Sequence, residues 1–128
     1  MKNMVTMVNV SDMERSVKFY RDILGLKLRY QSPGWSEFEV DASTLGLHSG
    51  GKPRAVTQGK REIIAGTASI GFNVVNVDRT YEELEAQGVR FIMEPTSREG
   101  EGIRLAVFLD PDGMAISVAQ ATSQTEHA

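Results

Sequence analysis

The sequence contains no cysteine, a single tryptophan and only two histidines among 128 residues. The absence of cysteine excludes disulfide bonds, thiolate-bound zinc and a cysteine nucleophile, and it leaves the redox compartment undecided. No apolar run approaches the roughly 18 residues that a membrane-spanning helix needs. The first residues also lack the apolar stretch and small-residue cleavage site of a signal peptide. We therefore expect a cytoplasmic protein that has no membrane partner.

An excess of one charge is also missing. The net charge is −3 and 24% of the residues are charged, which gives no reason to expect a nucleic-acid partner. A chain of this length suggests one compact domain with a substantial core. We predict a single domain over residues 1–122, with modules at about 1–49 and 67–122, a linker at 50–66 and a flexible tail at 123–128.

An internal repeat organises the chain, because an offset of 64 residues aligns Val8–Ser16 with Phe72–Thr80. Each segment leads into an apolar stripe with the i, i+4, i+7 spacing of one helix face. The stripes are Met13, Val17 and Tyr20 in the first half and Val77, Tyr81 and Leu84 in the second. Gly25 and Gly88 follow the two helices, where a left-handed C-terminal cap is expected. Ser11–Glu14 has the pattern of a capping box.

Strands are predicted around each helix, with turn signals between them. The first-half strands are Val5–Val10, Leu26–Gln31, Trp35–Val40 and Thr44–His48. The second-half strands are Ala68–Val74, Val89–Glu94, Arg104–Leu109 and Ala115–Ala119. Each half is therefore a βαβββ module, and the predicted fold is α+β, with two tandem modules forming a curved mixed-sheet trough that could hold a small molecule.

Three phrases of the sequence, VSDMERSVKFYRDILGLKL, VDRTYEELEAQGVRFIMEP and VFLDPDGMAISVAQ, resemble the vicinal oxygen chelate superfamily. This superfamily includes glyoxalase I, extradiol dioxygenases, fosfomycin-resistance enzymes and bleomycin-resistance proteins. The similarity covers about residues 4–120. Members share the scaffold while they isomerise, cleave rings, open epoxides or only bind, so the resemblance implies the fold and not one reaction.

In the enzymes that the resemblance implies, histidine and glutamate on the first and last strands of each half hold a divalent metal in the trough. The corresponding positions here are Val5, Gly46, Ser69 and Ser117. Valine and glycine side chains cannot coordinate a metal, and neutral serine is a poor ligand for such ions. We therefore predict no metal and no other cofactor, and we expect these four positions to line a ligand-binding trough.

His48 lies two residues after Gly46 on a predicted strand, so both should face the trough. We interpret His48 as a polar group in the ligand pocket. A solvated strand-end histidine and a catalytic base are alternatives. A relocated metal site is another, and it would need carboxylate partners such as Glu37, Glu39 or Glu94. His127 lies in the predicted tail and is discounted.

Alternation along Trp35–Val40 places Trp35, Glu37 and Glu39 on one face. Since Phe38 and Val40 suit the helix-facing core, we expect the other three side chains to bind the ligand. Trp35 would offer a flat surface to a planar molecule, with a cap over the sheet edge as the alternative.

The same alternation along Arg104–Leu109 indicates that Leu105, Val107 and Leu109 form core. Arg104 and Phe108 are then further candidate ligand-binding residues. A guanidinium there could orient a carboxylate or phenolate, and the alternative is a solvated strand-end charge.

These features favour a metal-free protein that sequesters a planar or aromatic organic molecule, similar to bleomycin-resistance proteins, which implies a homodimer. The alternative is a lyase, isomerase or dioxygenase-like enzyme that uses His48 with a carboxylate such as Glu39, or with a relocated metal. A third hypothesis is a scaffold for protein–protein contacts.

Overall fold

The structure is a computed structural model that describes residues 1–2, 4–52, 65 and 68–122. Most of the predicted linker and all of the predicted tail, including His127, lie outside these residues. The chain divides into two compact units. The first unit is Met1–Ala55 with Pro111–Gly113, and the second is Val56–Asp110 with Met114–Ala128. The single domain predicted over residues 1–122 stays a prediction.

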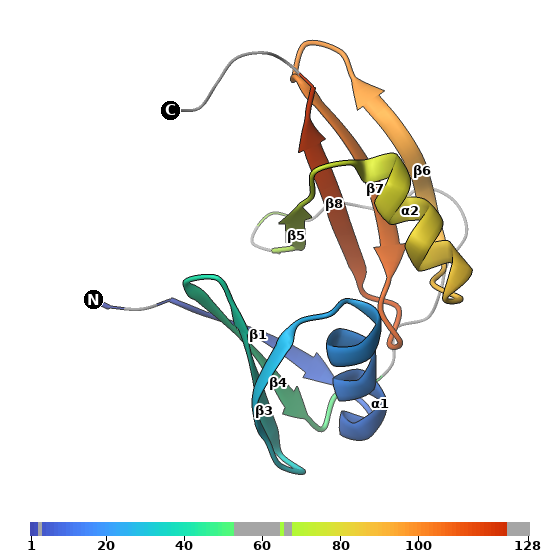
Figure 1. Ribbon diagram of the computed structural model, residues 1–128. Coiled ribbons are helices and arrows are strands. Elements are labelled where there is room, and N and C mark those ends of the chain that lie inside the picture. The colour runs from blue at the N-terminus through green and yellow to red at the C-terminus, as the bar shows by residue number, and fades with distance from the viewer. Residues whose placement is uncertain (3, 53–64, 66–67, 123–128) are drawn as a thin grey trace. The chain divides into compact units, whose positions relative to one another are not determined.

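Both units contain the predicted βαβββ order (Figure 1). The first unit contains β1 (Val5–Val10), α1 (Met13–Lys18), the π-helix η1 (Phe19–Ile23), β2 (Lys27–Gln31), β3 (Trp35–Val40) and β4 (Ser43–Ser49). The second unit contains β5 (Ile70–Asn73), α2 (Val77–Ala86), β6 (Phe91–Arg98), β7 (Ile103–Leu109) and β8 (Ala115–Ala121).

The two sheets have the same topology. The strand orders are β1-β4-β3-β2 and β5-β8-β7-β6, and in each sheet the first strand is parallel to the last while the other neighbours are antiparallel. This equivalence confirms the α+β fold with two tandem modules and agrees with the repeat seen in the sequence. It also confirms that Gly46 and Ser117 are equivalent, because they pair with Met7 and Gly71, which the 64-residue offset aligns.

The helices begin at equivalent residues, although the predicted capping box is wrong by one position. Asp12 is the N-cap of α1, and its carboxylate accepts a hydrogen bond from the Arg15 N–H at 3.1 Å. Asn76 caps α2 in the same way, because its Oδ1 accepts a hydrogen bond from the Arg79 N–H at 3.1 Å. A side-chain acceptor at this position satisfies one of the free N–H groups at a helix start.

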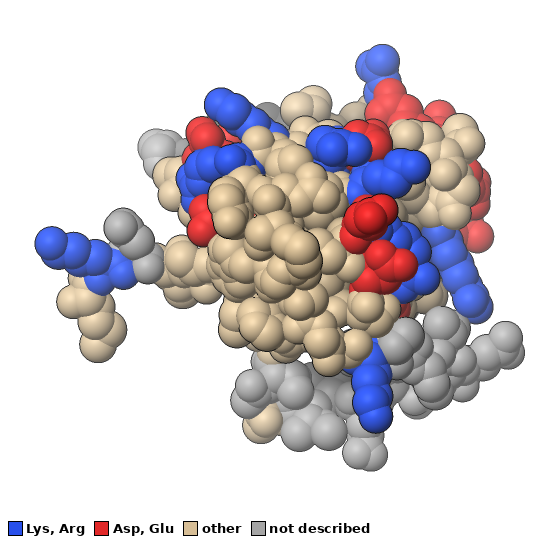
Figure 2. Space-filling view, turned by 90° about the horizontal axis from the view of Figure 1, so that it is seen from below, with Lys and Arg blue, Asp and Glu red and all other residues tan. Residues whose placement is uncertain are grey.

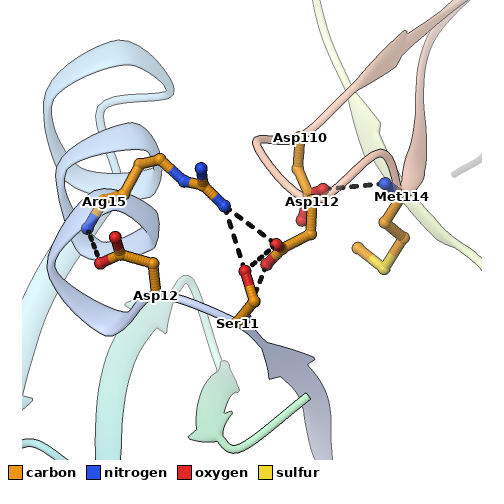
Figure 3. Close-up of polar contacts among 6 residues, drawn as sticks. All are labelled: Ser11, Asp12, Arg15, Asp110, Asp112 and Met114. Atoms are coloured by element: carbon orange, nitrogen blue, oxygen red, sulfur yellow. Dashed lines mark hydrogen bonds and ion pairs between the residues drawn. The ribbon is translucent and has the colours of Figure 1, made fainter. Parts of the chain in front are cut away.

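Ser11 is not the cap because it binds the turn between β7 and β8 (Figure 3). The Asp112 carboxylate accepts hydrogen bonds from the Ser11 N–H at 2.9 Å, from the Ser11 hydroxyl, and from Arg15 at 3.0 Å. The Asp112 side chain is only 7% exposed. Asp112 belongs to the first unit, so these contacts lie within that unit.

Glycine ends both helical segments, as predicted. Gly25 and Gly88 have φ angles of 75° and 88°, in the left-handed region that a side chain disfavours. After α2, the Val89 N–H donates to the Leu84 carbonyl at 3.1 Å, which closes the final turn.

The core of the first unit lies between its sheet and its helical segment. Val17 and Tyr20 are buried, and the Tyr20 ring packs 6.0 Å from the ring of Phe38 on β3. Phe38 is therefore on the helix side, as predicted. Trp35, Glu37 and Glu39 then lie on the opposite face, since side chains alternate along a strand.

The core of the second unit corrects the prediction for β7. Phe108 is fully buried and packs 5.5 Å from Phe91, while Ala106 is also fully buried. Arg104 shares their face and forms a bidentate ion pair with Asp78 on α2, with N–O distances of 2.9 Å. Arg104 and Phe108 thus face the helix, and the prediction that they point away from the core is wrong.

Candidate functional site

The face of the first sheet opposite α1, here called the far face, carries the candidate residues of the first unit. Its three cross-strand rows are Asn9–His48–Trp35, Met7–Gly46–Glu37 and Val5–Thr44–Glu39. From β2, Lys27 lies opposite Glu39 and Tyr30 opposite Glu37. Val5, Met7 and Tyr30 are 50%, 56% and 55% exposed, so the far face presents apolar side chains to solvent.

Trp35 lies over the backbone of Gly46. A Cβ atom added to Gly46 would lie 2.2 Å from Cη2 and 2.4 Å from Cζ2 of the indole. Contacts this short do not occur between carbon atoms, which approach to about 3.5 Å. Gly46 is therefore required for the position of the ring. The alternative of Trp35 as a cap over the sheet edge does not fit, because Gly46 lies on β4, between β1 and β3.

A series of hydrogen bonds fixes the indole at the edge that carries its N–H group. The Trp35 Nε1–H donates to Glu37 Oε1 at 3.0 Å, and Arg29 donates to Glu37 Oε2 from two nitrogens at 3.2 and 3.0 Å. Arg29 also donates to the Thr44 hydroxyl at 3.0 Å. The Trp35 hydrogen bond, and then that from Arg29, lower the pKa of Glu37 below its ordinary value. The Glu37 carboxylate thus stays ionised and fixes the ring.

Glu37 and Arg29 therefore have roles that the sequence analysis did not assign to them. Glu37 was a candidate ligand-binding residue, but both of its oxygens already accept hydrogen bonds within the protein. Arg29 and Thr44 were missed, although alternation from Lys27 and from Gly46 places both on the far face.

His48 lies at the edge of the Trp35 ring, with a centroid distance of 6.4 Å and an interplanar angle of 64°. Its imidazole is exposed on the far face, next to Asn9 on β1. The carboxylates considered as its partners bind elsewhere: Glu37 pairs with Arg29 at 3.0 Å and Glu39 with Lys27 at 3.8 Å. The geometry suits a polar group beside an aromatic surface.

The residues at the implied metal positions do not fit a divalent ion. In the first unit, Val5 offers only carbon, and the Trp35 ring occupies the space into which a side chain at Gly46 would project. In the second unit, Ser69 is exposed, while the Ser117 hydroxyl lies 2.6 Å from where a Cβ on Gly71 would be. Valine and glycine side chains offer no ligand atom, and neutral serine hydroxyls are poor ligands for the divalent ions that bind at these positions in the enzymes of the superfamily.

A relocated metal centre finds no support in the described part of the chain, where no group of three histidine, aspartate or glutamate side chains could hold an ion. Glu94 lies on β6 in the second unit, while His48 lies on β4 in the first.

Charges of both signs lie on the face of the protein that Figure 2 draws. Figure 2 shows basic and acidic side chains beside one another, next to a broad area of uncharged residues. The far face has the same character, since Lys27 pairs with Glu39 and Arg29 with Glu37. Among the described residues, no helix is long and apolar enough to cross a membrane.

Comparison with known proteins agrees with this fold. The model of the Glyoxalase/Bleomycin resistance protein/Dioxygenase superfamily matches residues 4–118. The lactoylglutathione lyase of Haemophilus influenzae is 30% identical in an alignment 124 residues long that covers 92% of this chain and 91% of that protein. A bleomycin resistance protein of Geobacillus stearothermophilus is 29% identical in an alignment 119 residues long that covers 87% of this chain and 90% of that protein.

A solved structure shows the same fold at lower identity. The fosfomycin resistance protein FosX from Listeria monocytogenes superposes with a TM-score of 0.73 at 18% identity, covering 95% of this chain and 94% of that one. At that identity the likeness concerns the fold alone.

Proposed function

We propose a function from the premise that this chain belongs to the Glyoxalase/Bleomycin resistance protein/Dioxygenase superfamily. The proposed function is metal-free binding of a planar or aromatic organic molecule on the far face of the first sheet. The observation that carries this proposal is the indole of Trp35, which lies over Gly46 and is held by Glu37. A rigid aromatic surface of this kind binds planar molecules by stacking, with little loss of side-chain entropy.

Other features of the far face support the same function. Met7 and Val5 extend the apolar surface along β1 beside Gly46, and a thioether packs well against aromatic ligands. His48 and Asn9 lie next to each other at one end of that surface and could donate or accept hydrogen bonds. A small number of polar groups around an apolar surface is typical of ligand sites.

An enzymatic function has less support from the geometry. The lyase among the relatives is an enzyme by name, but general acid–base chemistry at His48 would need a partner that orients or complements the imidazole. The two carboxylates on the same face as His48, Glu37 and Glu39, form ion pairs with Arg29 and Lys27.

Two titrations test the proposed function. The first adds zinc, nickel, manganese or iron(II) to tag-free protein and counts the bound metal. We expect no stoichiometric site, and a micromolar site that is lost in His48→Ala would contradict the metal-free proposal. The second adds planar aromatic molecules and follows the fluorescence of Trp35, the sole tryptophan.

A variant then locates the binding in the second titration. Trp35→Leu should weaken the affinity about three- to tenfold, as expected for loss of one aromatic stacking contact. This affinity is measured by calorimetry, since the fluorescent reporter is absent. Unchanged affinity in Trp35→Leu would place the ligand elsewhere.

The predicted homodimer is part of the same proposal, and it is supported by the sequence resemblance. We expect light scattering after size-exclusion chromatography to give twice the chain mass of 14.1 kDa. A mass of one chain at micromolar concentration would refute the dimer without affecting the binding site in the first unit.

A further inference from the structure

Among the described residues, the far face contains two cations and two carboxylates, and each cation is already paired with a carboxylate. Arg29 binds Glu37 at 3.0 Å and Lys27 lies 3.8 Å from Glu39. β1 and β4 contribute no lysine, arginine, aspartate or glutamate side chain to the face. The charges that surround the Trp35 ring therefore compensate one another.

The pair next to Trp35 is the more constrained of the two. Both Glu37 oxygens are used, one by the indole N–H and the other by Arg29, while Arg29 is held further by Thr44. A charged ligand over the ring would have to compete for these partners or lose its own hydration without replacement, which is unfavourable. An uncharged aromatic ring meets neither penalty.

We propose that the Arg29–Glu37 pair determines which ligand charge the far face accepts, and that the face selects uncharged planar aromatic molecules. Arg29 and Glu37 act here as positioning and specificity-determining residues rather than as ligand contacts. This proposal rests on the proposed function, since it assumes that the ligand stacks on Trp35.

The test uses three probes with one ring system and different charges: 2-naphthylmethanol, 2-naphthoate and trimethyl(2-naphthylmethyl)ammonium. Binding is measured at pH 8, where ordinary imidazoles are mostly neutral and carboxylates ionised. The readout is the single indole N–H resonance of the full chain, because Trp35 is the only tryptophan. This signal reports the site directly and needs no catalytic activity.

We expect the wild-type protein to bind the uncharged probe at least as tightly as either charged probe. Arg29→Met leaves the Glu37 charge without its cation, so the affinity for the ammonium probe relative to the alcohol should rise about two- to fivefold, the range for one exposed ion pair. Glu37→Gln keeps an acceptor for the indole but releases Arg29. The relative affinity for the naphthoate should then rise by a similar factor, again about two- to fivefold.

Arg21→Met is the matched control. It removes the same charge from an exposed pair with Asp22 on η1, which packs on the other side of the sheet. We expect it to leave the relative affinities of the three probes as in the wild type. Near-UV circular dichroism checks that each variant keeps its fold.

The possible failures are distinguishable. Tighter binding of either charged probe than of the alcohol by the wild type, or equal changes in Arg29→Met and Arg21→Met, would overturn the charge proposal and leave the aromatic site intact. If none of the probes shifts the indole resonance of the wild type, both the proposed function and this proposal are refuted.

Discussion

Replacing Gly46 by alanine tests the central feature of the candidate site, which is the close approach of Trp35 to the β4 backbone. The new Cβ would lie 2.2 Å from Cη2 and 2.4 Å from Cζ2 of the ring, more than 1 Å inside the contact distance of about 3.5 Å. Cη2 and Cζ2 belong to an indole that lies on the Gly46 backbone and donates a hydrogen bond to Glu37. The ring must therefore move, and this movement strains or breaks that hydrogen bond.

The expected size of the effect follows from two opposing contributions. Overpacking of this kind costs about 1–3 kcal/mol. Removing a glycine from a strand gains about 0.5–1 kcal/mol because alanine loses less backbone entropy on folding. The net expectation for Gly46→Ala is a loss of up to about 2.5 kcal/mol of unfolding free energy, measured by urea denaturation.

Gly34→Ala is the control, because nothing lies within 4 Å of a Cβ at that position and Gly34 is absent from the positive-φ glycines. We expect this variant to be neutral or stabilised by up to about 1 kcal/mol. A double-mutant cycle with Trp35→Ala then isolates the ring: in that background Gly46→Ala should no longer destabilise. Equal stability of Gly46→Ala and Gly34→Ala, with an unshifted indole N–H resonance in Gly46→Ala, would refute the proposed packing.

Three further outcomes are expected. Ser16→Ala should raise the unfolding free energy by about 0.5–1 kcal/mol in urea denaturation, since the Ser16 hydroxyl is buried and, among the described residues, finds no hydrogen-bond partner, while alanine favours the helix. A loss of stability would indicate an ordered water there. Asp112→Ala should lower the unfolding free energy by about 2–3 kcal/mol, because the Asp112 side chain is only 7% exposed and accepts three hydrogen bonds. A change below about 0.5 kcal/mol would show that these contacts are weak. Arg104 holds the pKa of Asp78 below its ordinary value. This pair therefore stabilises the fold above the ordinary carboxyl pKa of about 4, and its contribution is lost as the pH falls through the lower pKa of the folded state. Asp78→Asn should lose less stability than the wild type between about pH 5 and pH 2, and identical losses would contradict this linkage.

The fold could be predicted from the sequence because its signals agree with one another. The apolar stripe of the first predicted helix and the glycine after it predict the buried Tyr20, which lies on η1, and the left-handed Gly25. The least accurate strand was the one predicted to end at Glu94, before Pro95. Strand β6 instead continues to Arg98, because it is the outer strand of its sheet and its register shifts between Met93 and Thr96. An edge strand with a bulge tolerates a proline that an inner strand would not.

The same rule of alternation succeeded on β3 and failed on β7, and the composition of the two strands explains why. On β3 only one face is charged, so Phe38 could be assigned to the core without knowledge of its neighbours. On β7 both faces are largely apolar, and the single charge, Arg104, suggested that its face pointed away from the helix. The structure shows that Asp78 on α2 pairs with this arginine at the end of the buried face. A charged residue at the end of a strand can thus neutralise a helix side chain, and its face is then decided by the partner rather than by its own polarity.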